Sequence, residues 1–405
     1  MTRTQQAIDL SLQLAIQPSP NGRHLASALD PSKPFFWLAD TAWELPHRLD
    51  REEVELYLRN RAAKGFNVAM IVLFAEHGDG NWPFELSAGT FDLFAPNEEY
   101  FEFVDWIVDT AASLGIITAL VPTWGRYVNG GYYKGPFLFN DDNAFAFGRY
   151  VSNRYPFLPY ILGGDSNRFW NAEYRDQVAR GVDITTLPLT DYGSITEAFA
   201  RGLIQGEAPH IARSGVEYKT FITYHSAQVW LPQGPESTGS AQFPDASWLS
   251  LDACQSGHYN TAWRPVLPGD KLDNGQTGSV VDDPKLLPHL WRAMSSYVPI
   301  RKMYATPRPD GRPRPVLDLE PHYENTHHWF REGHPIWRAD NIRRGAWQGI
   351  FAGACGYTYG ANSIWQMHND QSKTHPPIQP PVSLLSADLA KRRRPLSRHG
   401  ISSST

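Results

Sequence analysis

Residues 35–74 read FFWLADTAWELPHRLDREEVELYLRNRAAKGFNVAMIVLF, which has the pattern of one strand–helix–strand unit. The runs at 35–40 and 66–74 are short and almost continuously apolar, as is typical of strands buried on both faces of a parallel sheet. Residues 50–64 between them predict a helix. Asp50 is the expected N-cap, acidic residues fill the first turn, and Gly65 is placed to end the helix.

The same alternation continues along the chain. The eight apolar runs are FFWLAD (35–40), FNVAMIVLF (66–74), GIITALVPTW (115–124), FLPYILGGD (157–165), EYKTFITYH (217–225), WLSLDACQSGH (248–258), RPVLDLEPHYE (314–324) and GYTYGANSIW (356–365). Helical patterns occupy 50–64 and 98–114, with weaker ones at 142–155, 193–213, 282–298 and 339–352. Eight strands alternating with helices predict an α/β fold, a single (β/α)8 TIM barrel. A doubly wound sheet is the alternative, but no G-x-G-x-x-G follows the first strand.

The ends of the chain differ from this pattern. We expect an N-terminal extension over 1–20, the catalytic barrel over 21–373, and a proline-rich linker with a basic, partly disordered tail over 374–405. Polar residues interrupt the apolar residues near the N-terminus, so no secretory signal is recognised and a cytoplasmic location is expected.

Composition narrows the possible partners. The 405 residues include 37 basic and 42 acidic side chains, a near balance that argues against nucleic acid and anionic membranes as partners. Two cysteines are too few for a disulfide scaffold or a four-cysteine zinc site. Aromatic residues make up 13% of the chain, and flat apolar rings are suited to stacking on sugars. An oligosaccharide is therefore the expected ligand, and the oligomeric state is left open.

Every predicted strand ends in polar or aromatic residues. Active sites of barrels lie at the carboxyl ends of the strands, so these residues should meet at the mouth. The set expected to bind substrate is Asp40, Trp43, His77, Trp124, Asn167, His225, Gln255, His258, Tyr323 and Trp365. Trp43, Trp124 and Trp365 should form an aromatic wall, and the polar members should bind sugar hydroxyls.

Two carboxylates stand out among the strand ends. Asp165 follows the fourth run and Glu320 follows the seventh, which predicts opposed acids on the barrel rim. Glycoside hydrolysis needs two carboxyl groups, one to protonate the leaving oxygen and one to attack or to activate water. Glu324 competes with Glu320 but lies past a turn, and Asp318 is expected to point away or to pack lower in the strand. Either acid could instead be a structural cap or ion-pair partner.

Other chemistries fit less well. No H-x-H pair ends the first strand, and the adjacent His327 and His328 are not spaced to reach one metal from a helix face. His77, His225 and His258 could form a metal trio, although binding of sugar hydroxyls is favoured. We therefore predict no metal and no cofactor. The alternatives are a non-catalytic carbohydrate-binding barrel and a metal-dependent hydrolase.

Several motifs resemble the apiosidase-like glycoside hydrolases (glycoside hydrolase family 140-like). These are PFFWLADTAWEL, YLRNRAAKGFNVAMI, YILGGDSN, TYHS, LDACQSGH and LEPHYE, in that order, and they span about residues 20–370. The resemblance implies a (β/α)8 barrel that removes a terminal sugar from plant pectic side chains. It also implies that Asp165 and Glu320 are the catalytic pair. Many relatives carry a β-sandwich after the barrel and a secretion signal, and neither is recognised here.

The two acids are assigned different roles. We expect Asp165 to be the general acid/base, with a pKa raised by burial and by Glu320. We expect Glu320 to be the nucleophile, kept ionised by a more polar environment that Arg314, Tyr323 or His258 could provide. Because opposed acids on the fourth and seventh strands of sugar-cleaving barrels usually resemble a retaining pair, retention is favoured.

Overall fold

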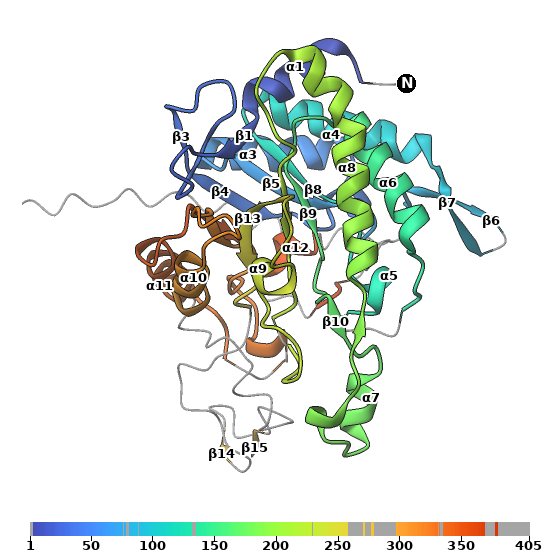
Figure 1. The fold of residues 1–405 in the computed structure, drawn as a ribbon, viewed down its shortest axis with the longest axis vertical. Coiled ribbons are helices and arrows are strands. Elements are labelled where there is room, and N and C mark those ends of the chain that lie inside the picture. Colours follow the sequence, from blue (N-terminus) through green and yellow to red (C-terminus); the bar gives the residue numbers. More distant parts are fainter. Residues whose placement is uncertain are drawn as a thin grey trace, which may run out of the picture.

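The fold is a closed barrel of eight parallel strands surrounded by helices (Figure 1). The computed structural model describes residues 3–75, 77, 81–87, 89–131, 135–228, 230–257, 270–271, 277–278, 297–330, 332, 335–368 and 377–379. The barrel strands are β4 (Trp37–Thr41), β5 (Val68–Val72), β8 (Ile117–Val121), β9 (Tyr160–Leu162), β12 (Ile222–Tyr224), β13 (Leu249–Cys254), β16 (Val316–Asp318) and β17 (Gly356–Tyr359). Each falls within one of the eight predicted runs, so the predicted (β/α)8 barrel is confirmed.

The barrel closes between β16 and β17. Neighbouring strands pair in parallel from β16 through β13, β12, β9, β8, β5 and β4 to β17. The N–H of Cys355, just before β17, donates to the carbonyl of Val316 in β16 at 2.9 Å. Chain order and spatial order therefore agree, which places the fourth and seventh strands on opposed parts of the rim.

The predicted helices have the expected boundaries. α3 (Arg51–Lys64) begins with a capping box made by Asp50 and Glu53, and it ends at Gly65 with φ 84°. α4 (Glu98–Ser113) is capped by Asn97, whose side chain accepts from the N–H groups of Glu99 and Tyr100. The other long helices are α6 (Asp141–Arg154), α8 (Gly193–Ser214), α10 (Tyr297–Ala305) and α11 (Ala339–Phe351). Most of the helical pattern predicted over 282–298 lies outside the described residues.

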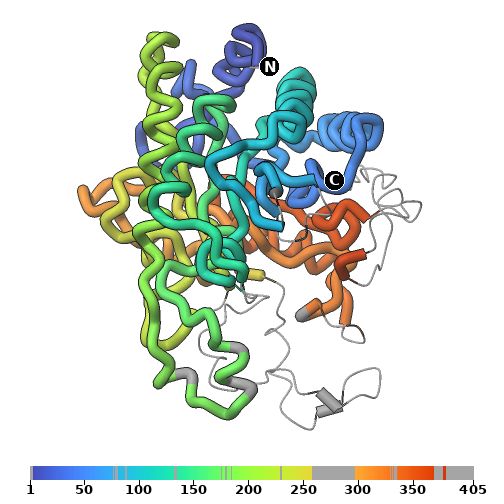
Figure 2. The backbone as a smooth tube through the Cα atoms, turned by 90° about the vertical axis from the view of Figure 1, so that its right-hand side faces the viewer, coloured from blue at the N-terminus to red at the C-terminus, as the bar shows by residue number. Residues whose placement is uncertain are grey.

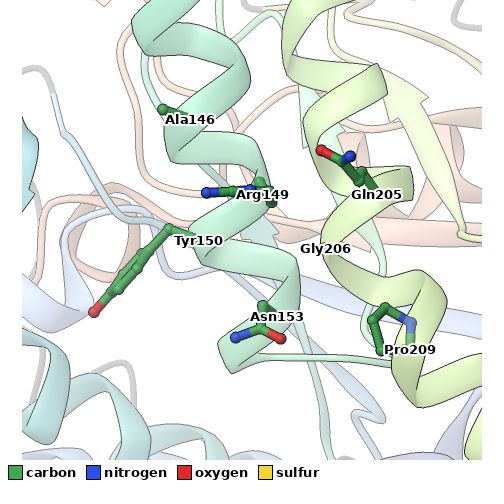
Figure 3. A pocket seen from close by; sticks show the side chains of 7 residues that line it. All are labelled: Ala146, Arg149, Tyr150, Asn153, Gln205, Gly206 and Pro209. Atoms are coloured by element: carbon green, nitrogen blue, oxygen red, sulfur yellow. The ribbon is translucent and has the colours of Figure 1, made fainter.

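Helices α6 and α8 lie side by side on the outside of the barrel in both views (Figure 1, Figure 2). Glycines permit this approach. A Cβ at Gly202 would lie 2.2 Å from the carbonyl oxygen of Phe145, and one at Gly206 would lie 2.2 Å from that of Arg149. A shallow cleft between the two helices is lined by Tyr150, Asn153 and other side chains that Figure 3 labels. It is away from the strand ends.

Additional structure covers the chain before the first barrel strand. α1 (Gln5–Leu14) is followed by a small antiparallel sheet of β1 (Ile16–Pro18), β2 (Leu25–Ser27) and β3 (Pro34–Phe35). The Arg3 guanidinium, just before α1, lies 2.7 Å from the Asp109 carboxylate of α4. This N-terminal structure therefore packs against the barrel and extends beyond residue 20.

Insertions after the strands build the opposite end of the molecule. The hairpin of β6 (Phe84–Ser87) and β7 (Thr90–Pro96) follows β5. The pair β10 (Phe169–Trp170) and β11 (Thr190–Asp191), with α7 (Tyr174–Ala179) between them, follows β9. In Figure 1, β10 and α7 lie at the end remote from α1. Over the described residues, none of the helices is both long and apolar enough to span a membrane.

Short elements complete the fold. They are the helices α2 (Leu45–Arg48), α5 (Arg126–Asn129), α9 (Gly239–Gln242) and α12 (Asn362–Trp365), two 3-10 turns at Ile184–Thr186 and His328–Phe330, and the strand pair β14 (Asp270–Lys271) and β15 (Thr277–Gly278). The side chain of Gln366, after α12, accepts from the N–H groups of Ile378 and Gln379. The start of the proline-rich segment is thereby held against the barrel.

Candidate active site

Asp165 stands on an unusual turn at the carboxyl end of β9. Gly163, Gly164 and Asp165 follow one another with φ of 98°, 61° and 55°, so three consecutive residues adopt the left-handed region. A Cβ at Gly163 would lie 2.3 Å from the carbonyl oxygen of His225, and one at Gly164 would lie 3.0 Å from the Trp124 ring. The two glycines therefore let the turn pass against β12 and Trp124. Asp165 itself bears a left-handed strain of about 1–2 kcal/mol.

Glu320 is held by backbone contacts after β16. The N–H of Glu320 donates to the Asp318 carboxylate at 3.2 Å, and its carbonyl accepts from the N–H of Gly257 at 2.9 Å. Asp318 also accepts from the Ser256 hydroxyl at 2.5 Å and from the Ser256 N–H at 3.2 Å. Asp318 thus packs below Glu320 and joins the seventh strand to the loop after the sixth.

Asp318 is fully enclosed. Burial raises its pKa from an ordinary 3.8 to about 6, although the hydrogen bonds from Ser256 and from the Glu320 N–H act in the opposite direction. A carboxyl group in this position is therefore protonated more readily than a surface aspartate. The protonation state of this brace changes the charge just beneath Glu320.

His225 connects the two acids. It follows β12, its side chain is completely buried, and its N–H donates to the Leu162 carbonyl at 2.6 Å. Ring atom Nδ1 accepts from the backbone N–H of Asp165 at 3.4 Å and lies 3.9 Å from that residue's Oδ1. Because Nδ1 is an acceptor, a neutral ring carries its hydrogen on Nε2. Nε2 lies 3.2 Å from Oε2 of Glu320, so the imidazole presents a positive edge to this carboxylate.

The three side chains form one compact cluster. One carboxylate oxygen of Asp165, one of Glu320 and one ring nitrogen of His225 all lie within 4.8 Å of one another. The Glu320 side chain is 5% exposed and that of Asp165 is 18% exposed, so the second is more open to a ligand. Such a cluster could work on a glycosidic bond. Its ligand atoms are also of the type and spacing that could hold a metal ion.

Aromatic rings surround this cluster. The Trp43 ring lies 5.3 Å from that of Trp124, and both rings lie within 6 Å of His225. The Trp43 indole N–H donates to the Tyr323 hydroxyl at 2.7 Å. Burial, followed by the nearby charge of Glu320, holds the pKa of Tyr323 well above 10, so this hydroxyl stays protonated.

The third predicted tryptophan lies beside the same ring system. Trp365 is 6.0 Å from Phe330, and Phe330 is 6.4 Å from Tyr323. His77 lies 6.5 Å from the Trp365 ring. The indole nitrogens of Trp124 and Trp365 are buried, and neither has a hydrogen-bond partner within the described part of the chain. Each could donate to a bound ligand.

Two predicted binding residues brace loops at the mouth. The Gln255 side-chain carbonyl accepts from the N–H of Gln228 at 2.7 Å. The Asn167 amide donates to the Ser237 hydroxyl at 3.2 Å, and its backbone carbonyl accepts from Asn129. His258 lies outside the described residues.

Asp40 requires a correction. It was expected to bind a sugar hydroxyl, but its fully buried carboxylate lies 2.6 Å from Nε of Arg61 in α3 and accepts from the Tyr57 hydroxyl at 3.0 Å. The side chain therefore points outward to the helix layer, away from Asp165 and Glu320. Glu324 is also engaged elsewhere, because its carboxylate accepts from the Tyr359 hydroxyl at 2.8 Å.

Sequence reasoning missed how two residues are used. His225 was expected to bind sugar, whereas it lies between both acids. Ser256 was not singled out, although it holds Asp318. The alternation Asp318–Leu319–Glu320 was the available signal, because residues two apart lie on one side of a strand.

Comparisons with known proteins agree with this architecture. A family model described as the apiosidase-like catalytic domain matches residues 19–386. A solved glycoside hydrolase family 5 protein from Bacteroides vulgatus ATCC 8482 aligns with a TM-score of 0.62 at 23% identity, covering 88% of this chain and 65% of that protein. A second structure, described as a glycoside hydrolase, aligns with a TM-score of 0.61 at 24% identity, covering 93% and 71%. At these identities the structures show the shared fold. No curated protein matches the sequence.

Proposed function

Since this chain belongs to the apiosidase-like catalytic domain family, we propose that it is a glycosidase that removes a terminal sugar from a plant-type, pectic oligosaccharide. In this proposal Asp165 is the general acid/base and Glu320 is the nucleophile of a retaining mechanism. The choice of pectic substrate rests on the family resemblance. The chain spans 65% of the first structural relative, so substrate and activity are proposed for this chain in its own right.

One observation carries the mechanism: an oxygen of Asp165 and an oxygen of Glu320 lie within 4.8 Å of each other. Retaining glycosidases place their carboxyl groups about 5–5.5 Å apart, whereas inverting enzymes leave about 6.5–9.5 Å for a water molecule. The short separation supports direct attack by Glu320. It leaves too little room for a water between the acids and the sugar.

The first step transfers the sugar to the protein. Glu320 attacks the anomeric carbon as the bond to the leaving oxygen breaks, and the Asp165 proton passes to that oxygen. The more exposed position of Asp165 suits contact with the departing group. In the second step Asp165 takes a proton from water, the water oxygen bonds to the anomeric carbon, and Glu320 is released.

His225 orients both acids in this scheme. Its Nδ1 accepts from the backbone of Asp165 and its Nε2 faces Glu320. A positive ring edge favours the ionised form of Glu320, which a nucleophile requires. The tryptophans would stack on the sugar. Replacing Trp124 by Ala should then weaken sugar binding more than it lowers the melting temperature.

The test measures hydrolysis on pectic oligosaccharides and follows the first-formed anomer by proton NMR. Asp165→Asn should slow turnover of substrates with poor leaving groups by about 10²–10⁴-fold. Aryl glycosides with good leaving groups should lose less in the first step. Glu320→Gln should abolish turnover of both. Glu324→Gln is the matched control and should stay close to wild type.

Three results would contradict the proposal. An inverted product would make Glu320 a general base. Unchanged turnover in Asp165→Asn and Glu320→Gln would remove both from catalysis. Tight sugar binding with no turnover of any substrate would favour a non-catalytic carbohydrate-binding barrel.

The cluster also favours a second candidate, a metal-dependent hydrolase. Asp165, His225 and Glu320 together offer two carboxylates and one imidazole, a ligand set that zinc accepts. Metal analysis of the purified protein and activity after chelation separate the candidates. Activity that is lost on chelation and restored by added zinc would support the metal-dependent reaction.

A further inference from the structure

A second cavity opens at the amino-terminal ends of the barrel strands, on the side opposite Asp165 and Glu320. It has a volume of about 330 Å³. Its walls come from the turn between β1 and β2, the starts of β12 and β13, and the loop that precedes β16. Active sites of barrels lie at the other end of the strands. The reaction proposed above therefore makes no use of this cavity.

Three cationic side chains line the cavity: Lys219, Arg308 and Arg312. Asp310 pairs with Arg312, whose guanidinium donates to the Asp310 carboxylate at 2.7 Å and 2.8 Å. The Lys219 ammonium donates to the backbone carbonyl of Ser247 at 2.5 Å, which leaves its charge uncompensated. The walls therefore carry an excess of positive charge.

Two buried guanidinium nitrogens add to this excess. Nε of Arg308 is buried and has no hydrogen-bond partner within the described ranges, and the same holds for Nε of Arg314, next to the cavity wall. Arg314 is 3% exposed. Its acidic neighbour is Asp252, whose carboxylate accepts from the Ser240 N–H at 2.9 Å. Buried donors without partners are costly, and an anion that accepts from them would offset the cost.

The cations also disfavour one another's charged forms. Burial, followed by Arg308, Arg312 and Arg314, lowers the pKa of Lys219 from 10.5. Burial and Arg312 lower the pKa of Arg308. Like charges held together without matching acids are the usual design of a site for an anion.

We propose that this cavity, the basal anion pocket, binds a small molecule that carries one compact oxyanion, either a carboxylate or a phosphate. Lys219 and Arg308 are its principal ligands, and Arg312 lies at its rim. The volume is near the lower end of the range for small-molecule pockets and is suited to a ligand the size of one sugar acid or sugar phosphate. This inference is independent of the proposed hydrolysis, because it uses none of the residues at the other end of the barrel.

Isothermal titration of the full chain tests the pocket with four probes: inorganic phosphate, glucose 6-phosphate, galacturonate and neutral glucose. At least one anion should bind at a 1:1 ratio while glucose does not. Preference for glucose 6-phosphate or for galacturonate identifies the phosphate or the carboxylate as the group recognised. Arg308→Gln and Lys219→Met should each weaken binding by about tenfold or more, the usual effect of losing one charge-assisted hydrogen bond.

Two controls make the result specific. Arg201→Gln removes an exposed positive charge from α8 and should leave the affinity within about twofold of wild type, because surface charges beyond the Debye length are screened. Glu320→Gln should bind the anions like wild type, which separates this pocket from the active site. Circular dichroism confirms that each variant is folded. The proposal is overturned if no anion binds saturably, if Arg201→Gln weakens binding as much as Arg308→Gln, or if Glu320→Gln abolishes it.

Discussion

Replacing Asp318 by Asn should change how the stability of the protein depends on pH. The folded protein holds the pKa of Asp318 at about 6, whereas its ordinary value is 3.8. Between these values the folded state binds a proton that the unfolded state releases. Asp318 therefore favours the folded state fully below about pH 4, and this contribution is lost as the pH rises through about 6.

The magnitude follows from the two pKa values. A difference between 3.8 and about 6 corresponds to about 3 kcal/mol of unfolding free energy. Asparagine keeps a carbonyl that can accept from the N–H groups of Ser256 and Glu320, and its amide can donate to the Ser256 hydroxyl. It does not ionise. Relative to wild type, the variant should therefore gain about 3 kcal/mol between pH 4 and pH 7.

The assay is urea unfolding of both proteins at half-unit steps from pH 4 to pH 8. The quantity of interest is the difference in unfolding free energy, because other titrating groups contribute to both proteins. Asp310→Asn is a contrasting control, since hydrogen bonds from Arg312 and the neighbouring backbone lower the pKa of that exposed carboxyl. A difference that does not change with pH would refute the reasoning. So would a variant that loses stability relative to wild type as the pH rises.

Three further predictions address other parts of the fold. Glu207→Gln should remove a loss of stability between about pH 4.5 and pH 7, because burial raises the pKa of Glu207 from 4.5 to about 7; unfolding at pH 5 and pH 8 would show it, and equal slopes would contradict it. Gly163→Ala should lower the melting temperature and the turnover number together, because its Cβ would lie 2.3 Å from the His225 carbonyl on a backbone with φ 98°. A variant with wild-type turnover would show that the turn adjusts at no cost. Asp40→Ala should destabilise the protein by about 3–5 kcal/mol in denaturant unfolding, because it leaves the buried Arg61 charge unpaired, while KM measured under folding conditions stays unchanged.

The sequence was informative about the barrel because its strands are buried on both faces. Each therefore appears as an apolar run, and the residues after the fourth and seventh runs are the two acids that the structure brings together. Asp40 failed by one position. In β4, Asp40 lies on the face toward α3, while Thr41 lies on the face toward Tyr323. A shift of one residue along a strand reverses the face, and an apolar run does not define its last residue that closely.

Other features depend on contacts that no local pattern contains. His225 lies between Asp165 and Glu320 because three separate strands meet at one rim. The unpaired guanidinium nitrogens of Arg308 and Arg314 depend on how a loop packs below the barrel. Spacing along the chain could not have indicated either arrangement.

The left-handed turn that carries Asp165 also limits which side chains can replace it. Among residues with a side chain, aspartate and asparagine adopt φ near 55° more readily than longer ones do. A glutamate at this position would supply the same acid chemistry with a longer reach, yet it would have to adopt a backbone that it rarely populates. The repertoire of workable acids is therefore narrowed by the main chain before chemistry is considered. For anyone redesigning this barrel, moving the proton donor by a methylene would require rebuilding the loop as well as changing the residue.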